Sequence, residues 1–200
     1  GTVVANAEGP AIRITGPLHE RFGEILTPAA LAFVTELHHR FGGRRHDRLA
    51  DRMRRRFEIG NGHDPRFRDD TRHIREDADW RVAGAGPGLE DRRVEITGPT
   101  DPKMTINALN SGAKVWLADQ EDATSPTWRN VIGGQLSLRD AIRGRLAYTN
   151  EDGREYRVTA EQTPTIVMRP RGWHLVEKHI EFTDRTGRRM DASGSLVDFG

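Results

Sequence analysis

Two short stretches of this sequence carry charged side chains at spacings that could do chemistry. The first, DQED from Asp119 to Asp122, places three carboxylates directly after an apolar run. Alternate residues of a strand face the same side, so we expect Asp119 and Glu121 to point together into a site, with Asp122 at its rim. Such carboxylates repel one another unless a cation, bound water or an Arg neutralises them. The pattern indicates a metal-related site or, as the plainer alternative, helix capping with surface salt bridges.

The second stretch, RPRGWH, begins at Arg169, which is the last residue of the run TIVMR. The guanidinium group of Arg is a rigid fork that binds carboxylates bidentately and keeps its charge at any relevant pH. Arg169 and Arg171 are therefore candidates for binding a small anion. Alternatively, Arg169 pairs with the acidic cluster, and both can hold, since one Arg can align the carboxylates with a substrate. His174 and His179 share no helix face, and we interpret both as structural residues rather than metal ligands.

Strands and helices in alternation must position these groups. Apolar runs predict strands at 94–98, 114–122 and 165–169. Residues with helical spacing occupy the segment between the first two strands and the segment that follows the second strand. Asp101 and Ser125 are expected to cap those two helices, because each is followed by Pro, which favours the first helical position. This order predicts a parallel sheet with crossover helices, in which functional groups gather at the carboxyl ends of the strands.

The region before this sheet has a different pattern. Residues 27–60 show helical spacing, with Thr27 as the N-cap, and Gly42-Gly43 is expected to divide them into two helices that form an antiparallel pair or a bent arm. Later in the chain, YTNEDGREYRV predicts a β-hairpin near 145–158. GAGPG at 84–88 lacks the spacing and the following helix of a dinucleotide-binding loop, so we interpret it as a plain connection.

Composition excludes several classes of protein. The 31 basic and 30 acidic residues leave a net charge of +1, which argues against a dedicated nucleic-acid-binding or membrane-surface protein. The Arg-rich segment at 51–57 is expected to be a solvated helix face. The sequence contains no Cys, which excludes disulfides and thiolate metal sites and fits a cytoplasmic protein. No stretch has the length of a membrane helix, so no membrane partner is expected.

Three longer segments resemble the A-type malate synthases. They are EDRRVEITGPTDPKMTINALNSGAKVWLADQEDATSPTWRNVIGGQLSLRDAI from residue 90, TPTIVMRPRGWHLVEKHI from residue 163 and SGSLVDFG from residue 193. The resemblance implies an α/β fold in which an N-terminal helical clasp, residues 1–76, precedes the first strands of a TIM (β/α)8 barrel. Residues 77–200 would form this first part of the barrel, incomplete in this chain, with the hairpin near 145–158 as an insertion.

The same resemblance implies an acyltransferase that condenses acetyl-CoA with glyoxylate and hydrolyses the thioester to give malate and CoA, with Mg²⁺ as cofactor. Arg169 would be the catalytic Arg, which stabilises the enolate oxygen. Asp119 and Glu121 would bind metal-bound water or Arg169, and Asp122 and Arg171 would support the substrate site. The family has an aromatic residue where this chain has Gln120, which we expect to change packing only.

The metal ligands and the general-base Asp are expected beyond Gly200, so no metal ligand is expected within this chain, and the chain alone should be inactive. Two alternatives remain open at this stage. One is another CoA-ester lyase on the same type of barrel, and the other is a non-catalytic Arg-rich module that binds anions or nucleic acid. Oligomeric state and the contacts with acetyl-CoA are not predicted.

Overall fold

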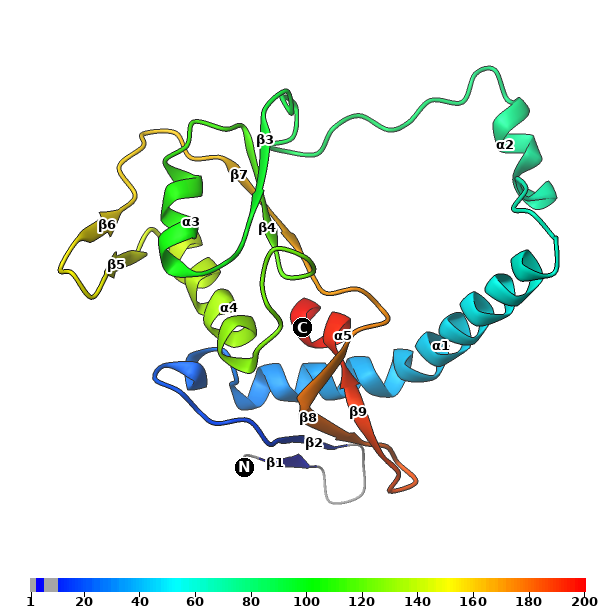
Figure 1. Ribbon diagram of the computed structural model, residues 1–200, viewed down its shortest axis with the longest axis horizontal. Helices are drawn as coiled ribbons and strands as arrows, with labels where there is room; N and C mark the ends of the chain where they lie inside the picture. Colours follow the sequence, from blue (N-terminus) through cyan, green and yellow to red (C-terminus); the bar gives the residue numbers. More distant parts are fainter. Residues whose placement is uncertain (1–2, 6–10) are drawn as a thin grey trace.

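The computed structural model describes residues 3–5 and 11–200, which form two sheets, a hairpin and a long helical arm (Figure 1). The strands are β1 (Val3–Ala5), β2 (Ala11–Ile14), β3 (Glu95–Gly98), β4 (Val115–Asp119), β5 (Ala147–Thr149), β6 (Glu155–Arg157), β7 (Thr165–Arg169), β8 (Val176–Thr183) and β9 (Arg189–Ser193). The α-helices are α1 (Pro28–Gly60), α2 (Arg72–Glu76), α3 (Pro102–Leu109), α4 (Trp128–Ile142) and α5 (Gly194–Phe199), with short 3-10 turns at Phe22–Glu24 and Asp69–Thr71.

The predicted parallel sheet is present, and it carries the candidate site. Its order is β3-β4-β7, with parallel pairing throughout, and α3 and α4 are the crossover helices. Trp116 of β4 packs with Leu109 of α3 and Leu138 of α4 in a small apolar core. The three strands do not close into a barrel, so the described residues show a mixed α/β fold.

A second, antiparallel sheet was not predicted. Its order is β1-β2-β8-β9, so it joins the start of the chain to the segment after β7. It packs in the larger core with α1, α4 and α5, where Ile12, Val131 and Ile180 are fully or almost fully buried. The first 76 residues are therefore not wholly helical, because β1 and β2 lie among them.

Helix α1 corrects the prediction of two helices. Gly42 and Gly43 lie inside one continuous 33-residue helix, which leaves the cores and forms an arm with α2 and the extended chain that returns to β3 (Figure 1). The helix is held on both sides of the Gly pair. Nε2 of His38 accepts from the backbone N–H of Ser193 at 2.9 Å, and Nε of Arg45 donates to the carbonyl oxygen of Trp173 at 2.7 Å. Each of these hydrogen bonds contributes on the order of 1 kcal/mol, which offsets the roughly 1 kcal/mol that each helical Gly costs.

The turn between β4 and α4 also differs from the prediction. β4 ends at Asp119, so Glu121 belongs to a turn, and strand alternation does not place it. Thr127, not Ser125, caps α4, with its hydroxyl accepting from the backbone N–H of Asn130 at 3.2 Å. The other local predictions are confirmed: Asp101 caps α3, β5 and β6 form the hairpin, and 84–88 is a loop.

Gly134 shows why α4 tolerates a Gly pair in its middle. A Cβ at this position would collide with the hydroxyl of Thr100 in the turn after β3. The Gly therefore lets the helix lie directly against the carboxyl end of the sheet. This close approach fixes the distance between α4 and the strand ends at which the candidate site lies.

The loop after β7 is anchored by a buried ion cluster. The guanidinium of Arg171 donates to Asp198 of α5 at 3.0 Å through both Nε and Nη2, and to Glu177 of β8 at 2.9 Å through Nη1. All three side chains are at most 1% exposed. Burial raises the pKa of Asp198 even though Arg171 opposes the rise. The cluster ties two separate elements, β8 and α5, to the residues that directly follow Arg169.

Replacing Arg171 with Met should destabilise the protein by about 3–5 kcal/mol, because Asp198 and Glu177 would remain buried without a cation. Urea unfolding monitored by circular dichroism measures this loss. Arg93→Met is the matched control, since Arg93 pairs with Asp91 at the surface, where ion pairs contribute at most about 1 kcal/mol. Equal losses in the two variants would contradict the role given to the cluster.

Candidate functional site

The candidate site is built on one pair of residues at the ends of neighbouring strands. Asp119 and Arg169 are register partners in the parallel pairing of β4 with β7. Nε and Nη2 of Arg169 each donate to the Asp119 carboxylate at 2.8 Å, in the bidentate arrangement that suits a guanidinium. The sheet thus brings together two residues that lie 50 positions apart in the sequence.

The Asp119 carboxylate is fully engaged. Beyond Arg169 it accepts backbone N–H groups from Glu121 at 3.0 Å, Asp122 at 3.2 Å and Ala123 at 3.1 Å. The side chain is 1% exposed. Arg169 and these backbone donors lower the pKa of Asp119 to about 2, despite burial. Asp119 is therefore an anion whose contacts hold both the turn and the Arg, and it has no oxygen left over for another ligand.

Arg169 keeps part of its guanidinium free. Asp122 also accepts from Nη2 of Arg169, at 2.7 Å, although the Asp122 side chain is 71% exposed. With Asp119 this accounts for the N–H groups of Nε and Nη2. Nη1 has no hydrogen-bond partner within residues 3–5 and 11–200, and the Arg169 side chain is 36% exposed. The arrangement can present a fixed positive donor to an anion or to a developing oxyanion.

Glu121 lies beside this pair but does not contact it. Its carboxylate forms no hydrogen bond or salt bridge with any residue that the structure describes. It faces Gly172 in the loop after β7: a Cβ on Gly172 would lie 3.1 Å from Oε2 of Glu121 and 2.9 Å from Nδ1 of His174. Glu121 is thus the one carboxylate of the cluster that the described chain leaves available.

The structure places Arg171 and Gln120 apart from the exposed part of the site. The Arg171 side chain is 1% exposed and is bound by Glu177 and Asp198, so it does not face a ligand and holds the loop in place. Gln120 is fully buried and points toward α4, where Nε2 donates to the carbonyl oxygen of Val131 at 3.3 Å. Gln120 therefore packs against α4, although in the sequence it lies between Asp119 and Glu121.

The described residues do not by themselves fit a divalent metal ion. In the part of the chain that the structure describes, no three His, Asp or Glu side chains are arranged to hold one. Asp119 is saturated and Asp122 pairs with Arg169. The turn carries three carboxylates, Asp119, Glu121 and Asp122, and the one guanidinium of Arg169 pairs with two of them, Asp119 and Asp122.

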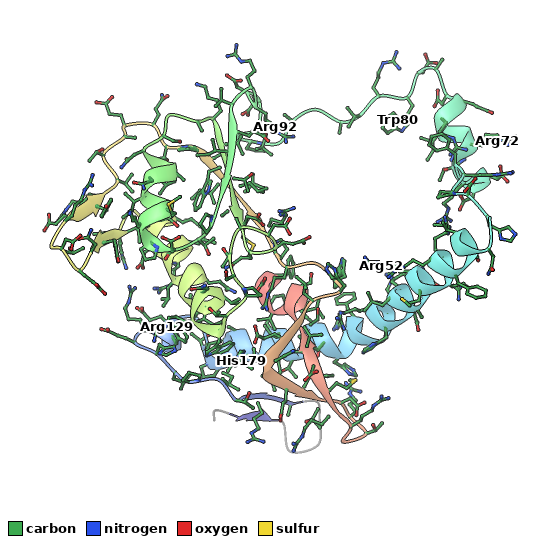
Figure 2. The ribbon with its side chains drawn as sticks, in the orientation of Figure 1. Arg52, Arg72, Trp80, Arg92, Arg129 and His179 are labelled. Carbon is green, nitrogen blue, oxygen red and sulfur yellow. The ribbon has the colours of Figure 1, made fainter. Side chains whose placement is uncertain are left out.

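Sequence reasoning missed several of the groups that shape this site. The pairing of Arg171 with Glu177 and Asp198 depends on β8 and α5, whose packing no local pattern specifies. His179 is held by its neighbours: its Nδ1 lies 2.8 Å from Oε1 of Glu177, and its ring stacks on Trp128 at the start of α4. Figure 2 labels His179 on β8. The Gly at position 172 was the available signal for close packing in the RPRGWH loop.

The arm carries exposed groups away from the site. Figure 2 shows Arg52, Arg72 and Trp80 along α1, α2 and the extended segment. Among the described helices, none has both the length and the apolar character to cross a bilayer.

The known proteins that this chain resembles are malate synthases. The model of the malate synthase N-terminal domain matches residues 11–73. Malate synthase from Streptomyces clavuligerus is 53% identical over 96% of this chain and 35% of its own length, and that from Myxococcus xanthus is 48% identical over 97% and 35%. Malate synthase A from Escherichia coli is 45% identical over 94% and 34%. The chain thus spans about a third of the length of the curated relatives that it matches.

The lowered pKa of Asp119 makes its contribution to stability depend on pH. A carboxyl whose pKa is lowered by folding stabilises the fold at pH values above its pKa in the unfolded chain. This stability is lost as the pH falls through the range from about 4 to about 2. After allowance for solvent near Arg169, we expect about 1–2 kcal/mol. The difference in urea-unfolding free energy between the native chain and Asp119→Asn should shrink by this amount between pH 6 and pH 2.5. An unchanged difference would contradict the pairing.

Proposed function

We propose that this chain, which is similar to malate synthases over nearly its whole length, is the N-terminal part of an acyltransferase that condenses acetyl-CoA with glyoxylate and releases malate and CoA. The single observation that carries the proposal is the fixed, partly free guanidinium of Arg169 at the carboxyl ends of parallel strands. Identities of 45–53% to malate synthases over nearly the whole chain support the same assignment.

Arg169 is the proposed catalytic residue. Deprotonation of the acetyl methyl group creates an enolate, whose negative charge is stabilised best by a donor that is already oriented and always protonated. Asp119 holds Arg169 by its Nε and Nη2 edge, so Nη1 points its two N–H groups away from the carboxylate. An Arg in this state stabilises charge and does not accept a proton, because Asp119 raises its pKa further.

The proposal includes a (β/α)8 barrel of which β3, β4 and β7 are the first strands. The parallel pairing and the crossover helices α3 and α4 support it. Residues 1–76 would act as the clasp and 77–200 as the start of the barrel, with the β5–β6 hairpin as an insertion. The antiparallel sheet draws β2 and β8 from both sides of this boundary, so the two parts share a core.

Mg²⁺ is the proposed cofactor, and when bound it would polarise the glyoxylate aldehyde. Its ligands and the general-base Asp are proposed to lie beyond residue 200, because this chain spans only about a third of the length of the malate synthases that it resembles. In the complete protein Glu121, with its unpaired carboxylate, would orient water near the metal. We further propose a cytoplasmic location, without a nucleic-acid or membrane partner.

The test is release of free CoA by the full-length protein, which should require acetyl-CoA, glyoxylate and Mg²⁺ together. In the same assay Arg169→Ala should lower turnover by at least about a hundredfold, the usual effect of losing one oxyanion donor. Arg157→Ala, an exposed Arg of β6 near Glu155, is the matched control and should retain normal turnover. Glyoxylate-independent release, or normal turnover by Arg169→Ala, would refute the proposal.

A further inference from the structure

A histidine and a carboxylate face the same point beside the Arg169 loop. A Cβ placed on Gly172 would lie 2.8 Å from Cε1 and 2.9 Å from Nδ1 of His174, and 3.1 Å from Oε2 of Glu121. Because the distances share one origin, Nδ1 and Oε2 are at most about 6 Å apart, a separation that one water molecule can bridge. Any side chain larger than hydrogen at 172 would push the two groups apart.

Neither side chain makes a structural contact that would explain its position. Glu121 and His174 form no side-chain hydrogen bond or ion pair within residues 3–5 and 11–200. His179, five residues later, offers the contrast, since Glu177 fixes it and Trp128 stacks on it. His179 is thus held by its neighbours, whereas His174 is exposed and neither of its ring nitrogens has a partner among the described residues.

The two groups also lie next to the proposed chemistry. Glu121 and Asp122 follow Asp119 in one turn, and Arg169 contacts two of these three residues. His174 is five residues beyond Arg169, in a loop whose Arg171 and Trp173 are each tied to other elements. The loop is thus anchored on both sides of Gly172, which keeps the imidazole near the carboxylate.

We infer that His174, oriented by Glu121, is the general base for the hydrolytic half of the proposed reaction, an inference that rests on the proposed function. A water oxygen adds to the thioester carbonyl carbon of malyl-CoA while one water proton passes to the His174 ring. The carbon–sulfur bond then breaks, and its electron pair leaves on the sulfur of CoA. The ring returns its proton to that thiolate, and the new carboxylic acid releases its remaining proton to solvent.

Imidazole suits this step because one ring nitrogen can take up a proton while the other donates to a carboxylate, which fixes the tautomer. Arg169 can hold the oxyanion of the same tetrahedral intermediate through Nη1. In this arrangement His174 is a catalytic residue and Glu121 is a positioning residue. The earlier carbon–carbon bond formation uses a different base, so the two halves of the reaction separate experimentally.

The experiment supplies chemically prepared malyl-CoA to full-length protein and follows the release of free thiol. His174→Gln should slow this hydrolysis by at least about a hundredfold, the lower range for loss of a general base. Glu121→Gln should slow it by a smaller factor, as expected for a residue that acts through His174. His73→Gln, a change at an exposed His of α2, is the matched control and should hydrolyse malyl-CoA at the normal rate.

A second measurement tests condensation in the same variants. With acetyl-CoA and glyoxylate, mass spectrometry of quenched His174→Gln reactions should show malyl-CoA accumulating to at least one equivalent of enzyme. Parallel loss of condensation and hydrolysis in His174→Gln, or normal hydrolysis by His174→Gln, would overturn the inference. If the unmodified protein fails to condense the substrates at all, the proposed function fails instead, so the two failures are distinguishable.

Discussion

The structure around the candidate site depends on the ion pair between the buried Asp119 and the partly exposed Arg169. Register in the parallel sheet places the two residues side by side, and the Asp119 carboxylate gathers the backbone N–H groups of the turn that follows β4. One anion therefore fixes both the direction of the guanidinium and the shape of the acidic turn. Because Asp119 is buried and fully hydrogen-bonded, this geometry exists before any ligand arrives, which is the condition for electrostatic preorganisation.

A second set of contacts keeps the other side of the site in place. Arg171 connects the loop after β7 to β8 and α5, and Arg45 connects α1 to the same loop through Trp173. The long helix is thus part of the support of the site, although its distal half extends away from both cores. Gly134 and Gly172 serve the same end, since each allows a close approach that a Cβ would prevent.

Much of the parallel sheet could be predicted from sequence because its signals are local. Apolar runs gave β3, β4 and β7, and Asp101 capped α3 as expected. The continuity of α1 could not be predicted, since it depends on distant contacts made by His38 and Arg45. The position of Glu121 was predicted from strand alternation, which ends at Asp119 when the carboxylate begins to bind the turn backbone. The partners of Arg171 were missed because burial of an ion cluster is a property of tertiary packing.

We propose that Asp119 acts on catalysis through Arg169 and not independently. A double-mutant cycle with Asp119→Ala, Arg169→Ala and the combined variant, followed by CoA release from the full-length protein, measures this dependence. We expect the combined variant to be no slower than Arg169→Ala alone, because Asp119 has nothing to orient once the guanidinium is absent. Independent, multiplicative losses of turnover would show instead that Asp119 acts without Arg169.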